Sequence, residues 1–391
     1  MGTKRRAMPD AMPELEEMLF ELGEVASHPR RMLRQYLAAG KKVVGCMPVY
    51  TPEELAHAGG MTPMGLWGGQ VTPSLAGKYN PVFTCSIMRS CLEYGMSGVY
   101  DGLGCVMMPM LCDTFRGMSA GWRAGVKAIP LVPFIHPQNR TDPGAPAFLT
   151  EEYRVVRALL EKHMHCEITD EALEKSIEVY NAHSAAMRSF ASAANEHLDV
   201  ITPAIRHHVF KSALFMPKEE HAARVLAIVR ELRKRPTHVW KGKKVILTGI
   251  TAEPEALLNV LAENGVAVTG DDLAQESRQY RTPIPEGGSP MERLPMERLA
   301  RQWFDRRGCS MAHETRAARG RMLTDMAKET GADGIVVCLM RFCDVEEYDY
   351  PMIAAEAEKA GLHCLCLDID QSTRDNGQSR TKIQSFVEMG M

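Results

Sequence analysis

The chain has 391 residues, which is enough for two or three domains of ordinary size. Hydrophobic residues make up 45% and charged residues 24%, and the formal net charge of -3 leaves no basic surface for nucleic acid. No apolar run is long enough to span a membrane, and the N-terminal segment lacks the apolar core of a secretion signal, so we expect a cytoplasmic protein without a membrane or nucleic-acid partner.

The first 150 residues alternate between helix and strand patterns. Amphipathic helices are predicted over 13–25 and 29–39, and a short helix is predicted after Thr51, which would cap it, with Pro52 at its first position. Strands are predicted in KKVVGCMPVY, MTPMGLWGG, CVMMPML and IPLVPFIHP, with a helix in CSIMRSCLEYGMSGVY. Alternation of this kind indicates a parallel sheet with helical crossovers, so residues 1–150 are expected to form an N-terminal α/β lobe.

Residues 151–240 carry apolar residues at helical spacing almost throughout, with one helix starting after Thr169, and predict a helical linking region. Residues 241–391 alternate again and predict a C-terminal α/β lobe. Its expected strands are KKVILTGI, VAVTGDD, DGIVVCLMRFCD and GLHCLCLDID, and its expected helices are AEPEALLNVLAENG, 311–330 and TKIQSFVEMG. The Pro- and Gly-rich stretch 282–295 predicts a loop.

The two lobes begin with similar segments, KKVVGCMPVYTPEE and KKVILTGITAEPE, which suggests that they share one architecture. The predicted fold class is therefore α/β, with two flavodoxin- or Rossmann-like lobes that contain parallel sheets and are joined by a helical segment.

Eleven cysteines are many for a cytoplasmic chain, where disulfides are rare. Metal binding or redox chemistry by some of them is favoured, although any single cysteine is most simply a small buried apolar residue. The chain has no C-x-x-C pair and no run of the ferredoxin type. A metal site would therefore have to be assembled by the fold from distant segments.

The carboxyl ends of parallel strands are where such sheets bind ligands. Cys46, Cys112 and Cys343 follow predicted strands, and Cys85 precedes a helix whose N-terminus would stabilise a thiolate. We expect these four cysteines to meet in a cleft between the lobes, where thiolates would suit zinc or an iron–sulfur cluster equally well. The remaining strand cysteines are expected to be core residues, with a minor redox pair as the alternative for the last two: Cys338, Cys364 and Cys366.

Three further features are weaker candidates. Glu53 or Glu54, in the first turn of the helix after the first strand, could face the cleft. His136 is most simply structural. The glycine pairs at 59–60 and 68–69 lack the spacing of a nucleotide-binding motif and are interpreted as tight turns.

Six segments, taken together, are specific enough to indicate a protein family: KKVVGCMPVYTPEELAHAGGMTPMGLWGGQ, PVFTCSIMRSCLEYGMSGVYDGL, MPMLCDTFRGMSAGWR, PFIHPQNR, LMRFCDVEEYDYP and RTKIQSFVEM. With them the chain resembles, from about Leu22 to its C-terminus, the 2-hydroxyacyl-CoA dehydratases, which are related to benzoyl-CoA reductase subunits. Within these segments PVYTPEE, WGGQ and CDTFRGMS look more like the β subunit than the α subunit.

The resemblance implies a heterodimer with an α subunit, in which each subunit holds a [4Fe-4S] cluster on three cysteines. Carried onto this sequence, the ligands would be Cys85, Cys112 and Cys343, with Cys46 as a further or substitute ligand. Glu54 is the candidate catalytic residue, although in a β subunit it would lie near the active site and not in it. Four arginines could hold the phosphates of coenzyme A, with solvated surface arginine as the default: Arg89, Arg116, Arg123 and Arg140.

The activity implied is that of a hydro-lyase in anaerobic amino-acid fermentation, which removes water from an (R)-2-hydroxyacyl-CoA to give a 2-enoyl-CoA through a ketyl radical. An ATP-dependent iron–sulfur activator would inject the electron. Two alternatives stay open at this stage. One is a benzoyl-CoA-reductase-like or double-cubane-cluster reductase subunit, and the other is a non-catalytic electron-transfer subunit.

Overall fold

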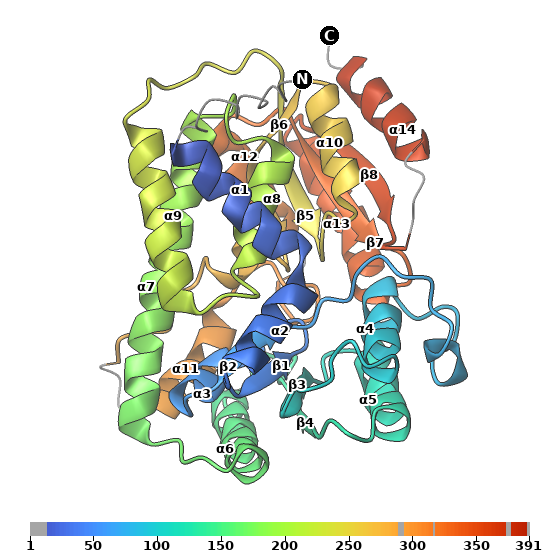
Figure 1. Cartoon of the computed structure of the whole chain (residues 1–391). Helices are drawn as coiled ribbons and strands as arrows, with labels where there is room; N and C mark the ends of the chain where they lie inside the picture. The colour runs from blue at the N-terminus through green and yellow to red at the C-terminus, as the bar shows by residue number, and fades with distance from the viewer. Residues whose placement is uncertain (1–13, 288–292, 316, 373–376, 389–391) are drawn as a thin grey trace, which may run out of the picture.

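The structure is a computed structural model of the chain that describes residues 14–287, 293–315, 317–372 and 377–388. Its first lobe is built on a four-stranded parallel sheet with the order β2-β1-β3-β4. The strands are β1 (Val43–Cys46), β2 (Thr62–Gly65), β3 (Cys105–Pro109) and β4 (Leu131–Phe134). Helices cover this sheet at the bottom of Figure 1: α2 (Pro29–Ala38), α3 (Glu53–Ala58), α4 (Ser86–Met96), α5 (Asp113–Gly125) and α6 (Ala145–Met164).

The second lobe repeats this architecture with the order β6-β5-β7-β8, again all parallel. Its strands are β5 (Lys243–Gly249), β6 (Val266–Leu273), β7 (Gly334–Met340) and β8 (His363–Ile369). Its helices are α10 (Glu255–Glu263), α12 (Ala318–Thr330), α13 (Asp344–Lys359) and α14 (Gly377–Glu388). Both sheets thus show the flavodoxin-like order 2-1-3-4, which confirms the predicted fold class.

A group of helices stands along one side of both lobes, on the left of Figure 1: α1 (Glu14–Ser27), α7 (Asp170–Glu196), α8 (Pro203–Ser212) and α9 (Lys218–Arg233). They enclose a core of their own, which includes Leu22, Phe190 and Phe210. The predicted helix start at Thr169 is confirmed, because its hydroxyl accepts a hydrogen bond from the backbone N–H of Ala172 at 3.1 Å.

Three predictions about local structure were wrong. Helix α3 is capped by Pro52 and not by Thr51, whose hydroxyl instead donates to the carbonyl oxygen of Met47 at 2.5 Å. The helix expected over 311–330 begins only at Ala318, because the segment before it crosses to the other lobe, where His313 pairs with Asn139. Helices α5, α11 (Pro295–Asp305) and α13 were not predicted, and α13 contains a proline, Pro351.

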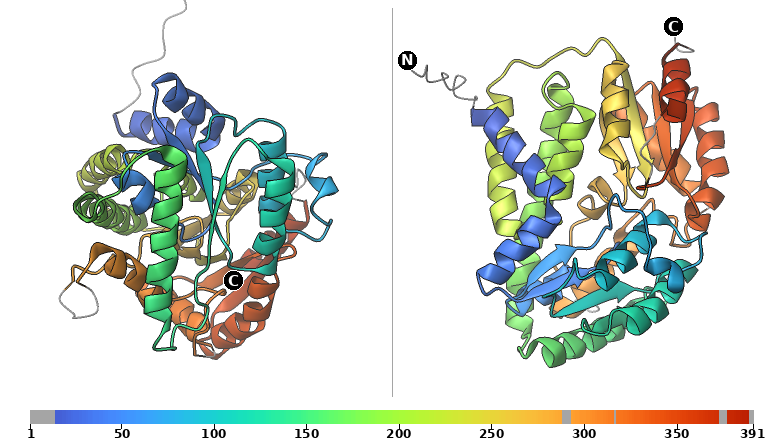
Figure 2. Two further views of the ribbon diagram at one scale, coloured as in Figure 1. Left: turned by 90° about the horizontal axis from the view of Figure 1, so that it is seen from below. Right: turned by 45° about the vertical axis from the view of Figure 1, so that its right-hand side comes forward.

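The two lobes are packed against each other at the carboxyl ends of their strands, as the right-hand view of Figure 2 shows. One cluster of buried side chains includes residues of both sheets, such as Val44 and Val336. A polar contact also crosses between the lobes, because the Gln371 amide donates to the Trp67 carbonyl oxygen at 3.0 Å. Helix α11 packs on α6 of the first lobe, where the Trp303 indole N–H donates to the Pro137 carbonyl oxygen at 2.9 Å. The short 3-10 helices η1 (Ala76–Lys78) and η2 (Ser277–Gln279) complete the described elements. Among the described helices, none combines the length and apolar character needed to cross a membrane.

Candidate functional site

Cys85, Cys112 and Cys343 share one structural position: each is the N-cap residue of a helix, α4, α5 and α13 respectively. No thiol makes a capping hydrogen bond of standard geometry. Burial raises the pKa of each thiol, and backbone N–H groups of the first helical turn partly oppose that rise, because their positive ends face the sulfur. The sequence therefore places three sulfurs at helix N-termini, whose partial positive charge opposes the effect of burial.

Two of these cysteines occupy equivalent positions in the two lobes. Cys112 stands three residues after β3, which ends at Pro109, and Cys343 stands three residues after β7, which ends at Met340. In each lobe this is the strand beside the point where the strand order reverses, and there open parallel sheets bind their ligands. Cys85 joins them from the connection between β2 and β3.

The three thiols are close enough to act on one another. Burial is the largest cause that raises the pKa of the Cys85 thiol, to about 11, and the neighbouring Cys112 adds to it. Burial likewise raises the pKa of Cys343, with Glu346, Cys85 and Cys112 adding to it. In the absence of a cation, each sulfur is thus held as a thiol in a desolvated site that already offers hydrogen-bond donors to an anion.

The residue types at this site bear on which metal group it could hold. Within the described ranges, no three His, Cys, Asp or Glu side chains are grouped around one point as a single metal ion requires. Ligands of an iron–sulfur cluster bind different iron atoms, so they stand farther apart than ligands of one zinc ion. Three thiols are donors of the kind that an iron–sulfur cluster binds.

The structure places Cys46 elsewhere. It is the last residue of β1 and lies buried in the wall of a small interlobe cavity. After burial, the side chains that act on its pKa are those of Glu53, Lys218 and Cys105. Its predicted role as a further ligand stays a prediction. Cys338 is a core residue, as expected, with 1% of its surface exposed.

Glu54 faces the same interlobe cavity, whose volume is about 50 Å³, enough for on the order of three water molecules. Its side chain is buried, and burial raises its pKa to about 7, with the neighbouring Glu53 adding to the rise while Arg306 and Lys218 oppose it. A carboxyl group that titrates near neutral pH can take up and release protons there. Glu53 lines the same cavity, so both glutamates of this helix turn face it.

Two polar groups beside Glu54 were missed from the sequence. The Tyr50 hydroxyl and the Arg306 Nε are buried, and neither has a hydrogen-bond partner among the described residues. The Arg306 guanidinium lies 4.5 Å from the centre of the Tyr50 ring, so both line one side of the cavity. Tyr50 also has a left-handed backbone, with φ of 64°, which is costly for a large residue and is typical of functional sites. The sequence signal that could have identified Tyr50 is its position in the loop that follows the first strand.

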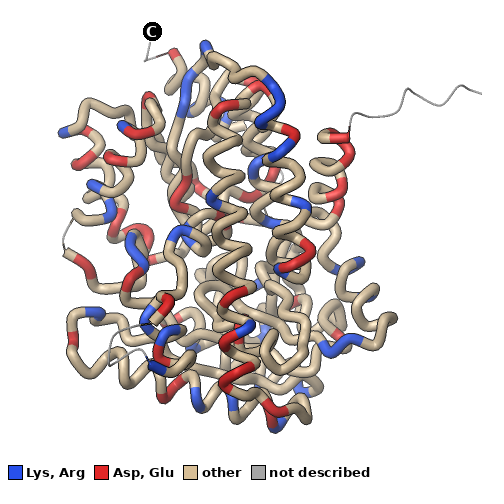
Figure 3. The backbone as a smooth tube through the Cα atoms, turned by 90° about the vertical axis from the view of Figure 1, so that its left-hand side faces the viewer, with Lys and Arg blue, Asp and Glu red and all other residues tan. Residues whose placement is uncertain are grey.

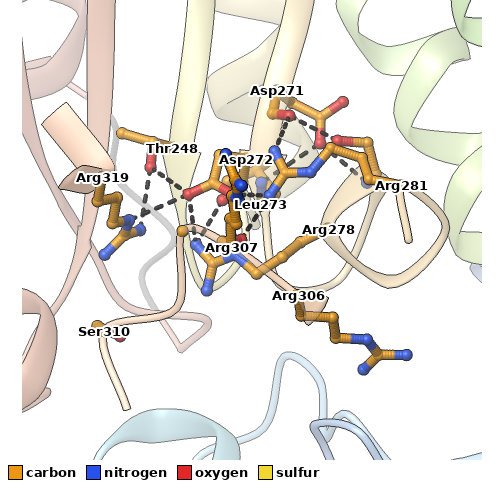
Figure 4. A network of polar contacts seen from close by, with 12 residues as sticks. Thr248, Asp271, Asp272, Leu273, Arg278, Arg281, Arg306, Arg307, Ser310 and Arg319 are labelled. Atoms are coloured by element: carbon orange, nitrogen blue, oxygen red, sulfur yellow. Dashed lines mark hydrogen bonds and ion pairs between the residues drawn. The ribbon is translucent and has the colours of Figure 1, made fainter. Parts of the chain in front are cut away.

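A buried ionic network holds the segment that carries Cys343. Asp272, at the end of β6, accepts hydrogen bonds from Arg278 and Arg319 at 3.0–3.1 Å and pairs with Arg281 (Figure 4). These arginines hold the pKa of Asp272 well below its usual range against the effect of burial.

The same network reaches the first turn of α13. One Arg319 nitrogen lies 2.9 Å from a carboxylate oxygen of Glu346, and the Ser310 hydroxyl donates to the other oxygen at 2.8 Å. Because Glu346 stands one turn after Cys343, the network fixes the start of the helix that Cys343 caps. Figure 4 shows Arg306 apart from this network, beside the pale blue ribbon of the first lobe.

The arginines proposed as phosphate ligands are scattered. Arg89 lies 3.7 Å from Asp370, Arg140 is paired with Glu314 and stacks over Trp303 at 4.2 Å, and Arg116 is exposed. Arg123 is exposed on α5. His136 is buried against the Tyr153 hydroxyl at 3.2 Å, and burial, with two nearby arginines, lowers its pKa to about 3, as suits a neutral structural imidazole.

Large apolar side chains are exposed directly beside two of the three cysteines. Val82 and Phe83 precede Cys85 and are 80% and 66% exposed, and Phe342 precedes Cys343 with 39% exposed. Tyr348, in the second turn of α13, is 80% exposed. Apolar groups gathered in this way mark a surface that another molecule covers.

Comparison of the sequence with known proteins identifies one family. The family model described as 2-hydroxyglutaryl-CoA dehydratase, D-component, matches residues 48–389. The chain is 43% identical to the lactoyl-CoA dehydratase subunit beta of Anaerotignum propionicum over 97% of this chain and 100% of that protein. It is 39% identical to the (R)-phenyllactyl-CoA dehydratase beta subunit of Clostridium sporogenes over 96% of this chain and 100% of that protein.

A reductase is a more distant relative. The chain is 26% identical to a benzoyl-CoA reductase subunit of Thauera aromatica over 80% of this chain and 82% of that protein. The matches along nearly the whole chain are instead to dehydratase β subunits, in agreement with the resemblance found in the motifs. The chain therefore belongs to the family of the 2-hydroxyglutaryl-CoA dehydratase D-component, the β subunits of hydro-lyases that act on 2-hydroxyacyl-CoA thioesters.

Proposed function

We propose that the chain is the iron–sulfur β subunit of an (R)-2-hydroxyacyl-CoA dehydratase and that Cys85, Cys112 and Cys343 bind its [4Fe-4S] cluster. The observation that carries this proposal is that all three cysteines cap helices and act on one another electrostatically. A cluster bound there would accept and return one electron at low potential. The chain's own contribution is to stabilise the negative thiolates with helix N-termini and to exclude water from them by burial.

The proposed reaction needs this electron because the proton that must be removed is on the β carbon. In a 2-hydroxyacyl thioester the carbonyl group acidifies the α C–H bond, whereas elimination of water must remove a proton from the β carbon. One added electron converts the thioester carbonyl into a ketyl radical, which expels the α hydroxyl and leaves the β proton acidic. The electron is returned once the 2-enoyl thioester has formed, so the elimination is redox-neutral overall.

Two partners belong to the proposal, an α subunit and an ATP-hydrolysing iron–sulfur activator that supplies the first electron. The relatives that match nearly the whole chain are named as β subunits, which supports an α partner. The exposed apolar side chains beside Cys85 and Cys343 support it too, since a second subunit would cover them. Glu54 is then a proton-exchanging group near the active site, at the interlobe cavity.

Iron and acid-labile sulfide, measured on the chain purified without oxygen, test the cluster. We expect about four of each per chain. Each of the single variants Cys85→Ala, Cys112→Ala and Cys343→Ala should lose them while keeping the wild-type circular dichroism spectrum. Cys364→Ala, a half-buried cysteine on β8, is the matched control and should retain both. Zinc without sulfide, or wild-type iron in all three variants, would refute the ligand assignment.

The reaction itself is tested with the α subunit and activator added. A dehydratase needs only catalytic amounts of reductant, because the electron is returned, whereas a reductase of the benzoyl-CoA type consumes electrons in proportion to product. Formation of 2-enoyl-CoA with many turnovers per electron supplied would support the proposal. Consumption of reductant in step with product would instead favour the reductase alternative, and clearly more than four irons per chain would favour a double-cubane relative.

A further inference from the structure

A second cavity in the described part of the chain plays no part in the site above. It is a groove of about 710 Å³, within the usual range for small-molecule sites. Its walls come from the α1–α2 junction, the loop after β2, the C-terminal part of α4, and the residues of α8 and α10 that face them. None of the candidate cluster cysteines lines it.

One rim of the groove is cationic. Arg30, Arg31 and Arg34 line it from α2, and Arg30 and Arg34 lie one turn apart on the same face. Arg31 is paired with Glu24 at 3.0 Å, whereas neither Arg30 nor Arg34 has an ion pair or side-chain hydrogen bond with any described residue. Figure 3 shows the chain change from red to blue as it passes from acidic α1 to basic α2. The rim thus offers two uncommitted guanidinium groups to an anion.

The floor of the groove is aromatic. Trp67, Tyr94 and Tyr100 line it, and the two tyrosine rings meet edge to face at 5.8 Å. The glycine pair after Trp67 makes this floor possible. A Cβ on Gly68, whose φ is +69°, would come within 1.9 Å of the Ser90 hydroxyl, and one on Gly69 within 2.9 Å of the Tyr94 hydroxyl. This turn therefore lets the backbone approach α4 and keeps the aromatic side chains facing the groove.

One of the two acidic groups in the groove is already paired with a cation. Glu253 pairs with Lys211 and accepts a hydrogen bond from the Gln371 amide at 2.6 Å. Glu255 is bound by His208 at 2.9 Å. Glu253 therefore does not cancel the charge of the arginine rim, and Glu255 is one carboxylate against the two unpaired guanidinium groups.

We propose that this groove binds a nucleoside phosphate, with its phosphates at Arg30 and Arg34 and its base against Trp67 and Tyr94. The arginine rim calls for an anionic group, the aromatic floor calls for a flat ring, and the volume suits a small molecule that carries both. A nucleoside phosphate has these properties. Two sources share this chemistry, the nucleotide portion of coenzyme A and a free adenine nucleotide. The first source rests on the proposed function, and the second does not.

Calorimetric titration of the cluster-loaded chain with coenzyme A, ATP and inorganic pyrophosphate tests the proposal. We expect coenzyme A or ATP to bind to the wild-type chain. The double variant Arg30→Gln/Arg34→Gln should bind the same ligand at least about a hundredfold more weakly, which corresponds to about 2.8 kcal/mol at 1.4 kcal/mol for each factor of ten. Arg230→Gln/Arg233→Gln removes two exposed arginines of α9, outside the groove, and should bind as the wild type does. Binding of coenzyme A alone would identify that source, and binding of ATP would identify the free nucleotide.

Three results would overturn the proposal: no binding of either nucleotide, equal binding by the Arg30/Arg34 variant, or binding of pyrophosphate as tight as that of the nucleotides. Hydrogen exchange provides a second measurement, since a ligand in the groove should protect the backbone at 26–34 and 65–70. Iron content measured on the same samples separates this result from the proposed function. If the chain contains iron but binds no nucleotide, only the proposal for the groove fails. If the chain binds a nucleotide but contains no iron, only the proposal for the cluster fails.

Discussion

Glu54→Gln should stabilise the folded protein above neutral pH. Its carboxyl group is buried, and its pKa is raised from 4.5 to about 7, chiefly by burial. A raised folded-state pKa means that the folded chain binds this proton more tightly than the unfolded chain. The resulting stability is fully present below pH 4.5 and is lost as the pH rises to 7. Since one pKa unit corresponds to 1.36 kcal/mol, ionisation costs the folded state about 3 kcal/mol above pH 7.

Urea unfolding of both proteins, without oxygen and from pH 5 to pH 8, measures this cost. We expect Glu54→Gln to exceed the wild type by about 3 kcal/mol at pH 8, with the gain shrinking as the pH falls toward 4.5. Dehydration with the α subunit should decrease if the carboxyl group exchanges protons during turnover. Stability gained together with activity lost would indicate that Glu54 is kept for function.

The adjacent carboxylate is the matched control, because its substitution should have the opposite sign. Glu53 lies 2.8 Å from the ammonium group of Lys218, whose side chain is only 6% exposed. Glu53→Gln leaves that buried cation without its partner and should destabilise the fold by about 3–5 kcal/mol. A Glu54→Gln variant that is no more stable than the wild type at pH 8 would show that the cavity solvates the Glu54 carboxylate, and the reasoning from burial would fail.

Three further outcomes are expected. Asp272→Asn leaves the three arginines of the buried network without a full counter-charge, so urea unfolding should show a loss of about 3–5 kcal/mol, and iron content should fall because the network holds the start of α13. Burial lowers the pKa of His207, but the neighbouring carboxylates of Glu253 at 3.6 Å and Glu276 at 2.7 Å outweigh it and raise the pKa to about 9. Its stabilisation, present below pH 6.5, should be lost as the pH rises to 9, and His207→Gln should abolish that pH dependence in thermal unfolding. Thr169→Ala removes the cap of α7 and should cost about 1 kcal/mol in the same assay.

The parts of the fold that the sequence predicted are those with local causes. The strands were visible as short apolar runs between helical patterns, and the cap at Thr169 depends on residues within one turn. The positions of Cys112 and Cys343 also followed from a general rule, because parallel strands present their carboxyl ends at one edge. Their shared role as helix N-caps was not foreseen, since neither α5 nor α13 was recognised as a helix.

The parts that were missed depend on contacts between distant segments. In α13 only Glu346, Ile353 and Ala357 are buried, so its apolar pattern is faint, and Pro351 lies inside it. The segment 306–315 carries local helix formers, yet it crosses between the lobes because Arg306 is buried beside Tyr50. That contact leaves no periodic signal in the sequence, because its partners are more than two hundred residues apart.

The proposed ligands come from both lobes, and this has a structural consequence. Cys85 and Cys112 belong to the first lobe and Cys343 to the second, so a cluster bound by all three would join the lobes covalently through its iron atoms. The lobes already meet there, since the Ser86 hydroxyl lies 3.3 Å from the Met340 sulfur. Because metal binding adds its free energy to the conformation that assembles the ligands, the cluster would stabilise the same lobe arrangement that closes the cavity around Glu54. Electron transfer and proton exchange at the proposed site would thus depend on a single interlobe geometry.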